Sequence, residues 1–203
     1  MLSNFNKTFR VTEMENSGEK IEFLKDVPSD VFNIMKGYGG MTFNGGLYRI
    51  HTYTSSVHWS IQVADYFSKY KNKILPFGFD WMGRQFCVHV NDHNMVIMLD
   101  PATGEDFEMR QDILSFHEED LAMDVDNMLA YELFKNILSH YKISDIRFSE
   151  CLGYRIPLFL GGIDNIDNYE KSDLEVYWHI HSQIFNKIRI IPSGTPINSI
   201  KIE

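Results

Sequence analysis

Four short apolar segments between residues 74 and 110 constrain the fold of this chain more than any other feature. The turns between them are rich in Asn, Asp, Gly and Pro. Short strands joined by short turns are typical of an antiparallel meander. The predicted strands are 74–79, 85–90, 95–99 and 107–110, with Asp80 to Arg84 as the first connection.

An amphipathic helix is predicted just before this meander. It begins at Thr54-Ser55-Ser56 and carries two apolar stripes, so its wide apolar face is expected to pack against the sheet. One helix on such a sheet predicts an α+β fold, with an antiparallel sheet and packed helices. The first stripe is Val57, Ile61, Ala64 and Phe67, and the second is Trp59, Val63, Tyr66 and Tyr70.

The composition changes after residue 115. Residues 116–126 are acidic, and Asp124 or Asp126 is expected to cap a helix over residues 127–141. The sequence therefore predicts two parts, residues 1–114 and 115–203. No Gly/Pro linker separates them, so they are expected to share an interface or to form one continuous globule.

The C-terminal part is organised around Cys151 to Trp178. Its apolar run, residues 156–160, is interpreted as a buried strand that ends at the Gly161-Gly162 turn, and an acidic, Asn-rich loop follows. Ser172-Asp173-Leu174-Glu175 is a capping-box pattern, so a helix to about Ile188 is favoured over an alternating strand. Closing strands are expected at 189–191 and 197–202.

Charge and cysteine content exclude several classes of protein. The 203 residues carry a formal net charge of −9, which makes direct nucleic-acid binding improbable and favours a basic partner. Cys87 and Cys151 are far apart in apolar surroundings, as expected for reduced thiols in the cytoplasm. No apolar run is long enough to cross a bilayer, and residues 1–10 lack a signal core.

Catalytic patterns are weak. His89 with His93, and His179 with His181, have spacings that can ligate zinc, but ordinary surface or core histidines are the favoured interpretation. Nucleophile elbows, P-loops and dinucleotide fingerprints do not occur in the sequence. The sequence therefore predicts a binding protein with no catalytic, cofactor-binding or metal-ligating residues, rather than an enzyme.

Two motifs are specific enough to compare with known families. The first is Cys151-Leu152-Gly153-Tyr154-Arg155-Ile156-Pro157-Leu158-Phe159-Leu160-Gly161-Gly162, with Asp167-Asn168 and Val176-Tyr177-Trp178 downstream. It resembles the C-terminal domain of a bacterial type VI secretion immunity family. The second is Pro76-Phe77-Gly78-Phe79-Asp80-Trp81-Met82-Gly83-Arg84-Gln85-Phe86. It resembles the GAD-like domain that precedes that domain, and also the broader SMI1/KNR4-type (SUKH) immunity proteins.

The resemblance implies a cytoplasmic immunity protein that binds a cognate secreted toxin, a DNase effector, and neutralises it by stoichiometric inhibition. A nuclease must bind phosphates, so a basic toxin surface would suit an acidic inhibitor. Two acidic surfaces are candidates for toxin binding, and Asp80, Trp81 and Arg84 form a weaker third. The first surface comprises Asp164, Asp167, Asn168, Glu170 and Asp173, and the second comprises Glu118, Glu119, Asp120, Asp124 and Asp126.

Two alternatives stay open at this point. One is a metal-dependent hydrolase that uses the histidine pairs, and the other is a SUKH-type general interaction module without a toxin partner. Bound zinc would favour the hydrolase, and the neighbouring gene would separate the other two hypotheses.

Overall fold

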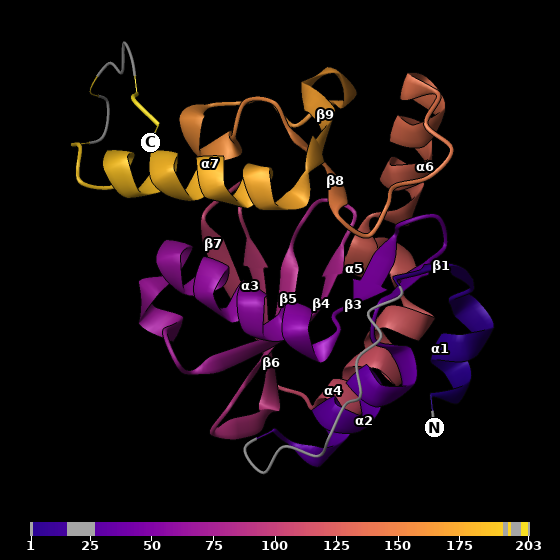
Figure 1. Cartoon of the computed structure of the whole chain (residues 1–203). Helices are drawn as coiled ribbons and strands as arrows, with labels where there is room; N and C mark the ends of the chain where they lie inside the picture. Colours follow the sequence, from indigo (N-terminus) through magenta and orange to yellow (C-terminus); the bar gives the residue numbers. More distant parts are fainter. Residues whose placement is uncertain (1, 16–26, 193–194, 196–199, 203) are drawn as a thin grey trace.

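A seven-stranded antiparallel sheet forms the centre of the computed structural model, which describes residues 2–15, 27–192, 195 and 200–202 (Figure 1). Each strand pairs with the next along the chain, so the order is β1 to β7. The predicted meander is present as its last four strands. The strands are β1 (Val11–Met14), β2 (Met41–Phe43), β3 (Tyr48–Ile50), β4 (Ile74–Asp80), β5 (Gln85–His89), β6 (Asp92–Asp100) and β7 (Glu105–Met109).

Helices cover both faces of this sheet (Figure 1). Side chains of β4 and β5 enter two different cores: Phe77 and Phe86 point to one face, and Phe79 and Cys87 to the other. In β4 the change of face between Phe77 and Phe79 accompanies a register shift between Pro76 and Gly78. The first core lies under α1, α2 and residues 113–129, and the second under α3 and α7. The helices are α1 (Ser3–Thr8), α2 (Ser29–Tyr38), α3 (Tyr53–Tyr66), α4 (Ile113–Ser115), α5 (Val125–Leu129), α6 (Tyr131–Tyr141) and α7 (Leu174–Ile188). The α+β prediction is confirmed.

Helix α3 packs with a narrower face than its sequence suggests. Trp59, Val63 and Tyr66 are buried against the sheet and α7, whereas Val57 is 43% and Ile61 is 61% exposed. The first predicted stripe is therefore wrong at these two positions, because a helix on a flat sheet buries about one third of its circumference. The side chain of Thr52 caps the helix by accepting a hydrogen bond from the Ser55 amide at 3.1 Å.

The helix predicted over residues 127–141 is interrupted at Ala130, whose φ is +49°. This left-handed residue separates α5 from α6, and Asp126 Oδ1 accepts a hydrogen bond from the Glu132 amide at 2.8 Å across the break. One π-helical segment, Phe116–Leu121, precedes α5. The acidic stretch is thus part of a helical layer.

The predicted buried strand over residues 156–160 is wrong. The strand β8 (Glu150–Tyr154) lies earlier and pairs with β9 (Tyr169–Asp173), while a short 3₁₀ turn covers Leu158–Leu160. Pro157 has no amide hydrogen to donate to a sheet, and Ile156 is 52% exposed. The glycine turn is present, since Gly161 has a φ of +86°.

Helix α7 confirms the helical interpretation of residues 174–188, with Asp173 as its cap in place of Ser172. Asp173 Oδ1 accepts hydrogen bonds from the amides of Glu175 and Val176, both at 3.0 Å. The strand expected at residues 189–191 is wrong, because the Ile191 amide closes a turn onto Ile188 at 2.8 Å. The other closing strand, 197–202, lies largely outside the described residues.

Buried hydrogen bonds connect the two predicted parts of the chain. Trp81 Nε1 donates to the Leu129 carbonyl at 2.6 Å, and Trp178 Nε1 donates to the Gly83 carbonyl at 2.7 Å. Arg49 donates to the Arg147 carbonyl at 3.0 Å. The division into residues 1–114 and 115–203 stays a prediction. Of the helices in the described residues, none has the length and apolar character needed to span a membrane.

Candidate functional site

The loop between β8 and β9 is held in shape by one buried amide side chain. Asn168 Nδ2 donates to the carbonyls of Ile156 at 2.9 Å and Ile163 at 3.0 Å, and its Oδ1 accepts from the Ile156 amide at 2.9 Å. Its side chain therefore acts as a bridge across the base of the loop. Only 8% of Asn168 is exposed. We predicted Asn168 as a toxin contact, but its side chain serves to position the loop.

A second set of contacts fixes Asp164 in the same loop. The hydroxyl of Tyr154 donates to Asp164 Oδ1 at 2.7 Å, and the hydroxyl of Tyr169 donates to the Tyr154 oxygen and to Asp164. Burial, reinforced by the Asp164 carboxylate, raises the pKa of Tyr154 well above its usual value. Tyr154 therefore stays protonated and able to donate at physiological pH.

The outer surface of the loop combines carboxylates with exposed aliphatic side chains. The Asp167 side chain is 85% exposed, and Glu170 makes one loose ion pair with Arg155 at 3.4 Å. Ile163 is 69% exposed and Ile156 is half-exposed. Exposed apolar side chains together with charged ones on one segment are typical of a protein-binding surface. Asp173, the last predicted contact, is the cap of α7.

The second predicted surface, residues 118–126, is used partly for local structure. Glu118 caps α1 by accepting from the Asn4 amide at 3.1 Å, and Asp120 accepts from Gln111. Asp124 accepts from Asn127 at 2.7 Å. Asp126 accepts from the Glu132 amide in the first turn of α6, as described above. Glu119 is exposed, and its side chain makes no hydrogen bond or ion pair within the described residues.

The structure does not bring these two surfaces together. The segment 118–126 lies beside α1, and the β8–β9 loop lies at the end of the molecule that carries α6 and α7 (Figure 1). A partner that contacted both would have to wrap around the sheet edge.

The third candidate, Asp80 with Trp81 and Arg84, serves the fold. Trp81 and Asp80 are fully buried. Asp80 Oδ2 accepts from Arg84 Nε at 2.6 Å, and its Oδ1 accepts from the amides of Met82 and Arg84. Few polar groups of this turn are therefore available to a partner.

The histidine side chains that the structure describes form no common centre. His179 is exposed on α7 and His181 is buried beneath it, so the two side chains diverge as a helix requires. No group of three metal-ligating side chains gathers within the described ranges, and the His93 side chain lies outside them. Burial lowers the pKa of His181 to about 4 and that of His51 to about 3, so both are neutral. Burial also raises the pKa of the Cys87 thiol, which keeps this thiol protonated and unreactive.

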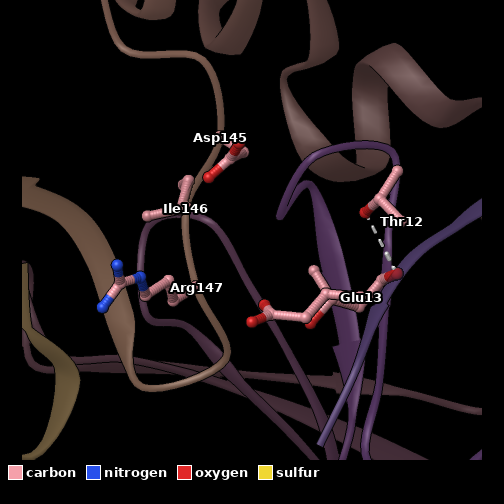
Figure 2. Close-up of a pocket in the computed structure, with 6 residues that line it drawn as sticks. Thr12, Glu13, Asp145, Ile146 and Arg147 are labelled. Carbon is pink, nitrogen blue, oxygen red and sulfur yellow. Dashed lines mark hydrogen bonds between the residues drawn. The ribbon is translucent and has the colours of Figure 1, made fainter.

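Sequence reasoning missed a pocket at the β1 edge of the sheet (Figure 2). Its volume is about 230 Å³, and its lining comes from three separate segments of the chain. No local pattern could have predicted a site whose walls are more than 100 residues apart. The lining residues are Thr12, Glu13, Thr42, Asp145, Ile146 and Arg147.

A solved structure shares this fold. The crystal structure of Atu4351 from Agrobacterium tumefaciens superposes with a TM-score of 0.63 at 13% sequence identity. The match covers 90% of this chain and 89% of that chain. The chain is thus an α+β protein of the same architecture as Atu4351. No curated protein sequence matches it.

A family model then identifies the C-terminal part. Residues 108–185 match the family described as T6SS immunity protein Tdi1, C-terminal. The match begins at the end of β7 and contains the π-helical segment, the β8–β9 loop and most of α7. The resemblance to a type VI secretion immunity family is confirmed by this match, which supports a role as a type VI secretion immunity protein.

Proposed function

We propose that this chain is a cytoplasmic immunity protein that binds a cognate DNase effector and neutralises it by stoichiometric inhibition. The observation that carries the proposal is the match of residues 108–185 to the type VI immunity family. Such a protein acts by occupying the toxin, and it performs no turnover of its own.

The β8–β9 loop is the surface that we assign to the toxin. Its backbone is fixed by Asn168 and by the Tyr154–Asp164 hydrogen bond. A preformed loop loses little conformational entropy on binding, and this lowers the cost of association. Ile163 offers an exposed apolar contact, and Asp167 in the loop and Glu170 at the start of β9 offer exposed negative charge.

The charge of the chain suits this partner. A nuclease surface that binds phosphates is electropositive, and a formal net charge of −9 accelerates encounter with such a surface at low salt. The side chains of His51, His181 and Cys87 are buried, so they are not accessible to a substrate at the surface. A hydrolase built on the histidine pair of α7 is therefore the weaker hypothesis, because those two side chains diverge.

The test is co-purification with the toxin encoded by the neighbouring gene. We expect a 1:1 complex by size-exclusion chromatography with light scattering, and loss of DNase activity at equimolar inhibitor. The absence of both a complex and protection would reject the proposal.

Two matched variants locate the surface. Asp167→Asn/Glu170→Gln and Glu119→Gln/Asp124→Asn each remove two exposed negative charges. We expect the first to weaken toxin binding about tenfold or more and to slow association, while the second binds as the wild type does. The reverse result would move the surface to residues 118–126.

A further inference from the structure

The pocket at the β1 edge has walls that hydrogen bonds hold in place. Thr12 Oγ1 donates to the Thr42 carbonyl at 3.2 Å and accepts from the Gly45 amide at 3.1 Å. The Ile146 amide donates to the Gly45 carbonyl at 3.0 Å, and buried Ile146 anchors the opposite wall. The two walls therefore come from different ends of the sequence and form a fixed cavity (Figure 2).

The floor of the pocket carries an unsatisfied polar group. Thr42 lines the pocket, is 1% exposed, and its Oγ1 has no hydrogen-bond partner among the described residues. Its neighbour Phe43 points into the core on the other face of the sheet, so Thr42 points to the pocket side. A buried hydroxyl without a partner costs free energy that a bound polar ligand would recover.

Two carboxylates flank the opening. Glu13 is paired with Thr42 across β1 and β2, and its side chain makes no hydrogen bond or ion pair within the described residues. Among the residues that the structure describes, the Asp145 side chain accepts only from the Ser144 hydroxyl, at 3.0 Å. In Figure 2 the carboxylates of Glu13 and Asp145 approach the opening from different sides, and the Arg147 guanidinium is directed away from both.

These groups match one kind of ligand. An ammonium group has three donors and no acceptor, and the pocket offers three acceptors in Glu13, Asp145 and Thr42. A divalent metal would need more acidic or histidine ligands than gather here. An anion would meet two carboxylates at the mouth. Buried Arg49 is paired with Thr42 across β2 and β3, so its side chain lies on the same face of the sheet as Thr42. Three backbone carbonyls accept its hydrogen bonds.

We propose that this pocket binds a primary ammonium group, namely the side chain of a lysine on the basic partner. The identity of the partner rests on the proposed function, whereas the ammonium chemistry of the pocket does not. The lysine stem would lie along Ile146, and its charge would sit between Glu13 and Asp145. The pocket is a second contact point, on a different edge of the fold from the β8–β9 loop.

The first experiment uses the full chain, labelled with ¹⁵N, and n-butylammonium as the probe. We expect saturable shifts of the Thr42, Gly45 and Ile146 amide signals. Glu13→Gln/Asp145→Asn should weaken this binding about tenfold or more, and Thr42→Val should also weaken it. The control Glu105→Gln/Glu108→Gln removes two exposed charges from β7, at the opposite edge of the sheet, and should bind as the wild type does.

Four results would overturn the assignment. The first is the absence of saturable shifts at these amides, and the second is equal affinity in Glu13→Gln/Asp145→Asn and the wild type. The third is tighter binding of n-butylguanidinium or Ca²⁺ than of n-butylammonium. The fourth is unchanged affinity of Thr42→Val for n-butylammonium. That result would show that the Thr42 hydroxyl is not an acceptor and would reject the three-acceptor arrangement.

A second measurement separates this inference from the proposed function. If the wild type and Glu13→Gln/Asp145→Asn bind the toxin equally, the lysine assignment fails and the immunity function stands. If the wild type binds n-butylammonium in the pocket but binds no toxin, the proposed function fails, and with it the assignment of the ammonium to a toxin lysine.

Discussion

Asn168 illustrates what an individual residue contributes to the candidate surface. The sequence predicted an acidic, Asn-rich loop, and this loop exists, but periodicity says nothing about which polar side chain turns inward. Asn168 turns inward because its amide can donate and accept at the same time, and so it satisfies backbone groups on both sides of the loop. A carboxylate at this position could accept from the Ile156 amide but could not donate to the two carbonyls.

Replacement of Asn168 tests this bridge. Asn168→Ala leaves three backbone groups at the base of the loop without partners, so we expect the free energy of unfolding to fall by about 1–3 kcal/mol. The matched control Asn127→Ala removes an exposed amide and should change it by less than about 0.5 kcal/mol. Urea denaturation measures both variants. Equal stability in the two would show that the loop does not depend on Asn168.

The buried histidines predict a pH dependence of stability. Burial lowers the pKa of His117 to about 4, while the unfolded chain keeps the ordinary value near 6.5. The unfolded state therefore binds more protons at intermediate pH, and the stability contributed by neutral His117 is complete above pH 6.5 and is lost as the pH falls. Between pH 6.5 and 5 we expect a loss of up to about 2 kcal/mol from this residue.

The measurement is the free energy of unfolding against pH for the wild type, His117→Gln and His179→Gln. In His117→Gln the decline between pH 6.5 and 5 should become shallower. Exposed His179 provides the control, and its variant should follow the wild-type slope. A wild-type stability that does not decrease on acidification would contradict the burial of neutral histidines.

Among the elements, α7 and residues 156–160 show where pattern reading succeeds and where it fails. Helix α7 was predictable because its cap and its apolar spacing agree over fifteen residues. Residues 156–160 are apolar and short, and an apolar run of that length does not distinguish a strand from a turn. The strand β8 lies before it, where Gly153 allows the chain to pass close beneath Tyr177.

Gly153→Ala tests the contact between β8 and α7. A Cβ at Gly153 would lie 2.3 Å from the Tyr177 ring, so the helix or the strand must shift, and we expect a loss of about 1–3 kcal/mol. Gly37→Ala, inside α2, meets no atom within 4 Å and should stabilise the chain by about 0.5–1 kcal/mol. Thermal unfolding compares the two. A neutral Gly153→Ala would mean that α7 packs more loosely than described.

At the scale of the whole molecule, hydrogen bonds join residues 1–114 to residues 115–203, the two parts that the change of composition predicted. The sequence predicted the α+β class and an interface between the two parts. It did not predict which residues make that interface, because pairs such as Arg49 and Arg147 are about a hundred residues apart. The pocket at the β1 edge was missed for the same reason. Contacts between distant segments leave no periodic trace in a single sequence.

Replacement of Arg49 tests whether the two parts of the chain unfold together. Arg49 is fully buried, and desolvation lowers its pKa to about 10, so it stays charged at neutral pH. Its guanidinium donates to the carbonyls of Asp80, Arg147 and Glu150, which come from both parts of the chain. We therefore propose that residues 1–114 and 115–203 unfold together, in one transition seen equally by calorimetry and tryptophan fluorescence.

Arg49→Met should lower the temperature of this single transition as a whole, with a loss of about 2–4 kcal/mol in the free energy of unfolding, because the carbonyls of Asp80, Arg147 and Glu150 lose their donor. The matched control Arg155→Met removes an exposed guanidinium and should cost less than about 0.5 kcal/mol. Two resolved transitions in the wild type, or early melting of residues 115–203 alone in Arg49→Met, would show two independent domains. In that case the β1-edge pocket, which needs both parts, would open as soon as they separate.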